Sequence, residues 1–293
     1  MSKSQCPILS GSLLTLTILI LLSSSADAQS LLWKIEADDH TSPSYIYGTI
    51  HIKDKRVFQF DEEVNEALKA CSLFAMEVDL NPEKMTGFAQ QLMLPEGQTL
   101  QNIFEPDDYE LIKTIIESET GMDMSWFDHM KPFALLSMAM NSQIHGEMEM
   151  TIDEFFYHQA TKEGKKIIGL ETIEEQLDML EKIPPRYIVD YFRNFHQGME
   201  DIEEIIRLYC LADLDKLLVL MQEDKAMATM EKQMITTRNQ RMTERIIPLL
   251  KDRPTFIAIG AGHLPGKKGV LKLLEKKGYA LTPVMTDAFE CAQ

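Results

Sequence analysis

The amino-acid sequence predicts an α/β protein in which a small mixed, largely parallel sheet carries large helical insertions. Six short apolar runs are rich in β-branched and aromatic residues, which is typical of buried strands; they lie at 31–37, 44–52, 73–80, 165–171, 255–262 and 279–284. Helical patterns separate several of these runs. Strands that are joined through helices pair in parallel, so the sheet is expected to be mainly parallel.

Two of the connections between strands have a clear helical pattern. The segment 61–71 (DEEVNEALKAC) spaces Val64, Leu68 and Cys71 along one face of a helix between the second and third strands. The segment 269–278 (GVLKLLEKKG) follows the fifth strand and closes on glycine, which is a frequent helix stop. Both segments favour strand–helix–strand units.

Two longer stretches, 81–164 and 173–252, have a helical pattern almost throughout. Within the first, the segment 105–121 (EPDDYELIKTIIESETG) begins with proline and acidic residues and ends on glycine, as many helices do. The sequence therefore predicts a small α/β core with a large helical insertion and a further helical layer before the last strands.

The first 28 residues have the layout of a secretory signal peptide. Lys3 precedes an uncharged run at 8–22, and small residues including Ala26 and Ala28 follow it. The run is shorter than the roughly 18 residues that a membrane-spanning helix needs. We expect cleavage after Ala28, export to the periplasm or the extracellular space, and no stable membrane span afterwards; an uncleaved anchor is the alternative.

Charge and cysteine content exclude some classes of function. The net charge is −17 and the pI is near 4.8, so phosphate backbones would be repelled and no nucleic-acid partner is expected. Beyond the predicted signal peptide, Cys71, Cys210 and Cys291 are scattered without a C-x-x-C spacing. They therefore indicate neither a zinc knuckle nor a redox motif.

Four predicted strands end on residues that can bind a metal or transfer a proton. YIYGTIH ends with His51 and FIAIGAGH ends with His263, so two strands share a Gly-x-x-His ending. LFAMEVD contributes Glu77 and Asp79, and IIGLE contributes Glu171. In open α/β sheets, ligands bind beyond the carboxyl ends of parallel strands. Two imidazoles with carboxylates suit a divalent ion such as zinc, manganese or cobalt, although each residue also has a purely structural interpretation.

With these motifs, and with KKIIGLETIEEQ, TTRNQRMTERI and AIGAGHLPGKKGVLKLLEKKGY in the same order, the chain resembles the TraB/GumN family. That family includes bacterial pheromone-shutdown and plasmid-transfer proteins and the animal Tiki proteases. The resemblance covers nearly the whole chain after the predicted signal peptide. It implies one TraB/GumN-like metallohydrolase domain over 29–293, and in the best characterised relatives this activity is a protease that trims an amino-terminal peptide segment.

The resemblance also implies roles for individual residues. It assigns the metal set to His51, Glu77 and His263. Its second acid is Glu171, and either Glu171 or Glu77 would be the general base.

The sequence RNQRM matches the Arg-Asn signature of the family. The resemblance thus makes Arg238 and Asn239 candidates for holding a substrate carbonyl or carboxylate, or for bracing Glu171. Gln176 is a polar residue that follows the second acid in the same family pattern.

The leading interpretation is an exported metallohydrolase, a peptidase that acts on peptides or on extended segments of proteins with metal-activated water. Two other classes remain open. One is a non-catalytic protein that binds a peptide or a small molecule, and the other is a metal-independent hydrolase like the erythromycin esterases, whose strands also end in G-x-x-H. No G-x-S-x-G sequence occurs, which argues against an ordinary serine hydrolase. The sequence indicates no particular oligomeric state.

Overall fold

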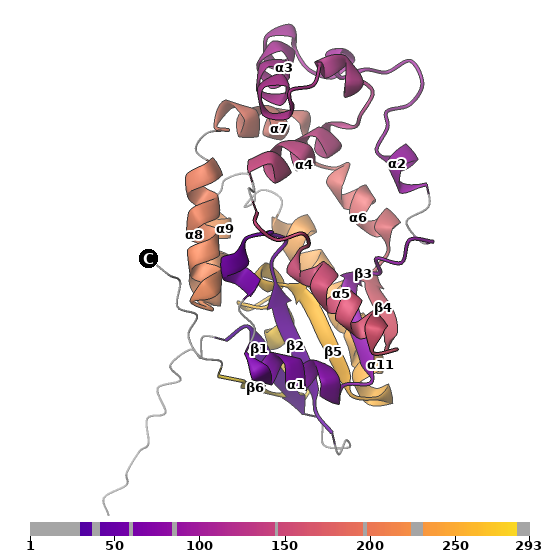
Figure 1. The fold of residues 1–293 in the computed structure, drawn as a ribbon, viewed down its shortest axis with the longest axis vertical. Helices are drawn as coiled ribbons and strands as arrows, with labels where there is room; N and C mark the ends of the chain where they lie inside the picture. The colour runs from indigo at the N-terminus through magenta and orange to yellow at the C-terminus, as the bar shows by residue number, and fades with distance from the viewer. Residues whose placement is uncertain are drawn as a thin grey trace, which may run out of the picture.

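A six-stranded sheet forms the centre of the protein (Figure 1). The computed structural model describes residues 30–36, 42–58, 61–83, 87–143, 146–195, 198–223 and 231–285. Each of the six strands expected from the sequence is present, shorter by one to three residues: β1 (Leu32–Glu36), β2 (Ser44–Thr49), β3 (Leu73–Val78), β4 (Lys166–Glu171), β5 (Thr255–Gly260) and β6 (Ala280–Pro283).

The sheet is mixed and mainly parallel, as predicted. Its strand order is β4-β3-β5-β2-β1-β6. The first four of these strands are parallel to one another, whereas β1 is antiparallel to both of its neighbours. Helix α1 (Glu62–Ala70) joins β2 to β3, yet β5 lies between these two strands. The chain therefore returns at its end to fill the middle of the sheet.

Helices occupy most of the two stretches for which the sequence predicts them. The first stretch contains α2 (Phe88–Gln91), α3 (Pro106–Thr120), α4 (Pro132–Gln143) and α5 (Ile152–Lys162). The second contains α6 (Ile173–Leu180), α7 (Pro185–Arg193), α8 (Gly198–Cys210), α9 (Leu214–Glu223), a π-helical turn η4 (Lys232–Thr236) and α11 (Thr237–Asp252). Near the C-terminus, a short 3-10 turn η5 (Ala261–His263) follows β5, and α12 (Val270–Glu275) precedes β6.

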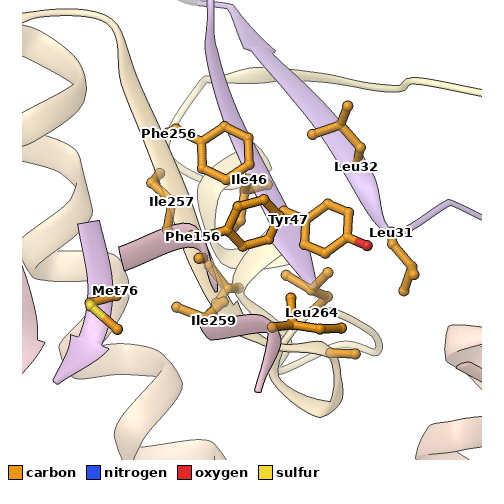
Figure 2. Packing of buried hydrophobic residues seen from close by; sticks show 14 of the residues in the cluster. Leu31, Leu32, Ile46, Tyr47, Met76, Phe156, Phe256, Ile257, Ile259 and Leu264 are labelled. Atoms are coloured by element: carbon orange, nitrogen blue, oxygen red, sulfur yellow. The ribbon is translucent and has the colours of Figure 1, made fainter. Parts of the chain in front are cut away.

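The main hydrophobic core lies on the sheet. Figure 2 shows Tyr47 of β2 beside Phe156 of α5 and Phe256 of β5. The rings of Tyr47 and Phe156 meet edge to face with centroids 5.2 Å apart, and those of Phe156 and Phe256 are 5.3 Å apart. All three side chains are fully buried, so these contacts fix α5 against the sheet.

A group of helices lies at one end of the molecule, beyond the sheet (Figure 1). We call α2, α3, α4, α6 and α7 the helical cap. The cap has two hydrophobic clusters of its own, one around Ile112, Leu135 and Phe192 and a smaller one around Phe133 and Leu177. Because α6 begins two residues after β4 ends, the cap lies beyond the carboxyl ends of the parallel strands.

The predicted export signal falls outside the described part of the chain, which begins at residue 30. Among the residues that the structure describes, no helix is both long enough and apolar enough to cross a membrane.

Candidate active site

The two Gly-x-x-His endings lie side by side, because β2 and β5 are neighbouring parallel strands with Thr49 opposite Gly260. Glycine is needed for the close packing of these ends. A Cβ atom on Gly48 would lie 2.9 Å from Cδ1 of Leu264 and 3.1 Å from Cα of Ala261. The glycine of the first motif thus makes room for the turn that carries the second histidine.

Glu77, near the end of β3, is the centre of the site. Its Oε1 accepts a hydrogen bond of 2.8 Å from the backbone N–H of Gly260, and its Oε2 lies 2.5 Å from Nη2 of Arg238. Burial alone would raise its pKa, but Coulombic attraction from His263, once that ring is protonated in acid, and from Arg238 and His51 outweighs burial and holds the pKa of Glu77 well below its usual range. Glu77 is therefore an anion at neutral pH.

Glu171, at the end of β4, shares the same arginine. Its Oε2 lies 2.9 Å from Nε and 2.6 Å from Nη2 of Arg238, and Gln176 donates to the same oxygen at 3.3 Å. Nη1 of Arg241 approaches the other carboxylate oxygen at 3.5 Å. Burial tends to lower the pKa of Arg238, but Glu77 and Glu171 raise it, so the guanidinium bridges two buried carboxylates.

His263 is buried and held by the residue next to Arg238. Its Nδ1 lies 2.6 Å from Oδ1 of Asn239. Because an amide oxygen can only accept, Nδ1 carries the hydrogen and Nε2 carries the lone pair. Burial lowers the pKa of His263 to about 4 against the opposing effect of Glu77, so the ring is neutral at pH 7. Nε2 lies 3.7 Å from Oε1 of Glu77.

His51 follows β2 and lies at the rim of this cluster, with 63% of its side chain exposed. Its Nδ1 is 2.8 Å from Oδ2 of Asp153, whose other oxygen accepts a hydrogen bond of 2.8 Å from Thr49. Asp153 raises the pKa of His51, and Glu77 adds to this effect. Among the described residues, His51 makes no hydrogen bond or ion pair with Glu77 or His263, but its charge lowers the pKa of both.

The structure brings together most of the side chains expected from the sequence. Direct contacts join Glu77, Glu171, Arg238, Asn239 and His263, whereas His51 is linked to them only through its charge. Arg238 and Asn239 face the site from α11 as expected, and Arg238 braces Glu171, which was one of the roles considered for it. Arg238 holds both carboxylates, and Asn239 contacts the histidine rather than Glu171.

Sequence reasoning missed Asp153. An acidic residue in the first turn of a helix has a simple explanation in the helix dipole, so the sequence gives no sign of a second role. Its contact with the end of β2 depends on how α5 docks across the sheet, which no local pattern encodes.

The donors have features that suit a divalent metal ion. Nε2 of His263 and Oε1 of Glu77 face each other as two acceptors without a hydrogen between them. Two ligands about 2.1 Å from one tetrahedral ion are roughly 3.4 Å apart, which is close to the observed 3.7 Å. Nevertheless, within the described ranges no three His, Cys, Asp or Glu side chains are already gathered as a complete ligand set.

Residues 31–283 match the family model described as the TraB/PrgY/gumN family. Similar proteins include Metalloprotease TIKI1 of Danio rerio, 24% identical over 87% of this chain and 63% of that protein, and Metalloprotease TIKI2 of Xenopus tropicalis, 24% identical over 87% and 60%. Metalloprotease TIKI1 of Homo sapiens is also 24% identical, over 87% and 62%. The chain thus spans about three-fifths of the length of these relatives, and no solved structure matches it significantly. By the family match, which covers most of its length, the chain belongs to the TraB/PrgY/gumN family.

Proposed function

We propose that this protein is a metal-dependent hydrolase, and specifically a peptidase. One observation carries the proposal: a neutral imidazole nitrogen and an ionised carboxylate oxygen face each other at 3.7 Å, at the carboxyl edge of a largely parallel sheet. The names of the similar TIKI proteins, which are metalloproteases, favour peptide bonds as the substrate. At 24% identity, the substrate itself remains part of the proposal.

His51, Glu77 and His263 would hold the ion, which we expect to be manganese, cobalt or zinc. Once bound, such an ion polarises a carbonyl group and lowers the pKa of water. The protein contributes orientation, since Asn239 fixes the tautomer of one histidine and Arg238 together with the Gly260 N–H keeps Glu77 ionised.

We assign Glu171 to holding Arg238 rather than to proton transfer. Only 1% of its side chain is exposed, and its Oε2 accepts from both Arg238 and Gln176. Glu77, whose Oε1 lies 3.7 Å from Nε2 of His263, is then the acid beside the proposed metal site, and we propose that it, rather than Glu171, takes part in the reaction. Because Glu171 stays covered, its removal should loosen Arg238 rather than remove a base.

Arg241 is the cation best suited to contact a substrate. About a third of its side chain is exposed, and its contacts with Glu171 and Glu175 are long, at 3.5 and 3.7 Å. Arg238, by contrast, directs two of its nitrogens at carboxylates and Nη1 at the carbonyl of Met234. We propose that Arg241 binds a peptide carbonyl or carboxylate at the edge of the site.

Export is a separate part of the proposal, based on the pattern of residues 1–28. Expressing the full chain in a secreting host and sequencing the N-terminus of the mature protein tests it. A new terminus at Gln29 is expected, whereas an intact Met1 would contradict cleavage.

The test of activity combines metal analysis with a peptide screen. Purified protein is analysed for bound metals and incubated with a mixed peptide library, with and without added manganese, cobalt or zinc, and the products are identified by mass spectrometry. We expect peptide cleavage that a chelator abolishes. H263A and E77Q should each reduce the cleavage rate by more than 100-fold. K272A, which alters an exposed ion pair with Glu275 on α12, is the matched control and should keep full activity.

The alternatives give different results in the same experiment. Cleavage that resists the chelator would instead support a metal-independent, esterase-like hydrolase. Tight binding of peptides without any cleavage, at any metal concentration, would support a non-catalytic binding protein.

A further inference from the structure

Asp153 is a buried carboxylate at the start of α5 that the helix does not need as a cap. Only 5% of the residue is exposed. The capping box of α5 is formed by other residues, because Thr151 accepts from the N–H of Glu154 and Glu154 accepts from the N–H of Thr151 at 2.7 Å. A buried carboxylate is costly unless it has partners, so its contacts indicate why it is there.

Its two oxygens point to the end of β2. Oδ1 accepts from the hydroxyl group of Thr49, and Oδ2 lies 2.8 Å from Nδ1 of His51. Oδ2 is itself shielded from solvent, and within the described part of the chain it accepts no hydrogen bond of good geometry, so the 2.8 Å ion pair with His51 is its close polar contact. Among those residues, no lysine or arginine pairs with Asp153. His51 is therefore the group that compensates the negative charge of this buried oxygen.

The second histidine motif has a matching arrangement. Nδ1 of His263 is held by an oxygen of Asn239 on α11, and Nδ1 of His51 is held by an oxygen of Asp153 on α5. The amide oxygen of Asn239 and an ionised carboxylate oxygen of Asp153 can only accept, so each favours a hydrogen on the Nδ1 that faces it, and Nε2 is directed away from the holding residue. His263 is also fixed by burial, whereas His51 is mostly exposed and, among the described residues, pairs with Asp153.

We propose that Asp153 is the positioning residue of His51, which fixes the ring so that Nε2 serves the candidate site. The claim that Nε2 of His51 serves the candidate site rests on the proposed function, whereas the claim that Asp153 fixes the ring does not. Hydrogen-bonded oxygens of this kind set the tautomer of metal-binding histidines, and their loss typically costs 10–100-fold in metal affinity.

The test compares Asp153→Asn with Asp153→Leu, two side chains of similar size of which only asparagine can accept a hydrogen bond. The first readout is the imidazole N–H proton signal of His51 in metal-free protein, assigned by its absence in H51Q. In the wild type we expect a resolved downfield signal that exchanges slowly with water, because Oδ2 of Asp153 lies 2.8 Å from Nδ1 and is shielded from solvent. D153N should keep the signal and D153L should lose it.

The second readout is Co²⁺ affinity by calorimetry, expected to fall about 10–100-fold in D153L and by less in D153N. Thr49→Val is the matched control, because it removes the other contact of Asp153 and should leave the His51 signal in place. Persistence of the signal in D153L, or equal loss in D153N and D153L, would overturn the positioning role. If the wild type binds no Co²⁺, the proposed function fails, while the N–H signal still decides the role of Asp153.

Discussion

At the scale of single residues, two consecutive side chains of α11 serve both halves of the site. Arg238 bridges Glu77 and Glu171, and Asn239 fixes His263 while donating to the carbonyl of Lys268. The π-helical turn η4 ends two residues before Arg238, and such turns occur frequently at functional sites. One helix therefore sets both the charge of the carboxylates and the tautomer of the histidine.

Replacing Arg238 with methionine should destabilise the protein by about 3–5 kcal/mol, because it leaves two buried carboxylates without their cation. Urea unfolding followed by circular dichroism measures this loss. Adding E77Q and E171Q to the same chain should restore much of the stability by removing the buried charges. R253M, which breaks an exposed pair with Asp252, should change the stability by less than about 0.5 kcal/mol. An equal loss in R238M and R253M would contradict the buried ion pair.

Because His263 is buried in its neutral form, we expect the free energy of unfolding to decrease as the pH is lowered. Its pKa falls from an ordinary 6.5 to about 4, so between these values only the unfolded chain takes up the proton. Stability is therefore lost as the pH drops from 6.5 to 4, by about 3 kcal/mol at roughly 1.4 kcal/mol per pH unit. Unfolding measured across this range should show a steeper decline in the wild type than in H263Q.

His51 serves as a control, because its contribution to stability changes with pH in the opposite direction. Asp153 raises its pKa from 6.5 to about 9, so its contribution is complete below pH 6.5 and is lost as the pH rises towards 9. Solvent screens this exposed ring, so the effect should be small. H51Q should therefore leave the loss of stability between pH 6.5 and pH 4 unchanged. A decline in H263Q as steep as in the wild type would show that His263 is not buried in its neutral form.

The sequence predicts the acids and histidines of the site better than it predicts their partners. Glu77, Glu171 and His263 stand out because strand ends are a recurrent place for functional side chains. The partner of each depends on packing between segments that are distant in the chain. This is why Asn239, for which Glu171 was one possible partner, lies on His263, and why the contact of Asp153 with His51 was not expected.

At the scale of elements, the neighbouring ends of β2 and β5 explain the repeated Gly-x-x-His motif. The sequence predicts both strands from their β-branched residues, but not that they are adjacent. Periodicity reports which face of a strand is buried and says nothing about its neighbour in the sheet. Because β5 inserts between β2 and β3, the two motifs meet and Glu77 on β3 reaches the N–H of Gly260.

The two motif glycines should respond differently to alanine. At Gly48 the new methyl group would press on the backbone of Ala261 at 3.1 Å, so G48A should lower stability by about 1–3 kcal/mol. At Gly260 it would meet Oε1 of Glu77 at 3.2 Å, an atom at the end of a side chain that can give way. G260A should therefore keep most of its stability but weaken Co²⁺ binding. Thermal unfolding and calorimetry on both variants measure the difference, and a stable G48A would contradict tight packing of the strand ends.

At the scale of the whole molecule, the sheet and the helical cap have separate hydrophobic cores. The largest cluster surrounds the sheet, while two others lie within the cap. Ion pairs from Glu175 on α6 to Arg241 and Arg245 on α11 link the cap to the helix that holds the site. Gln176, on the same cap helix, contacts both Glu77 and Glu171. The cap thus adds a polar side chain to a site that the sheet builds.

Because the two cores are separate, we expect that backbone amides of the cap can lose protection from hydrogen exchange while those of the sheet keep it. Ile112 is fully buried in the cap, and Ile257 is fully buried on β5. Each substitution by alanine should cost about 2–5 kcal/mol locally, because it removes buried methyl groups and leaves a cavity. Hydrogen exchange followed by mass spectrometry should show faster exchange of peptides from 88–143 and 173–195 in I112A, with the strands of the sheet unchanged.

I257A is the matched control, since it removes the same atoms from the other core and should speed exchange in β2, β3 and β5. Local opening is expected in I112A because the contacts of Ile112 lie within the cap's own cluster, so that its loss does not reach the aromatic core around Phe156. If I112A instead accelerated exchange in the sheet as much as in the cap, the two cores would unfold as one cooperative unit. In that case Gln176 would leave the site only when the sheet itself unfolds.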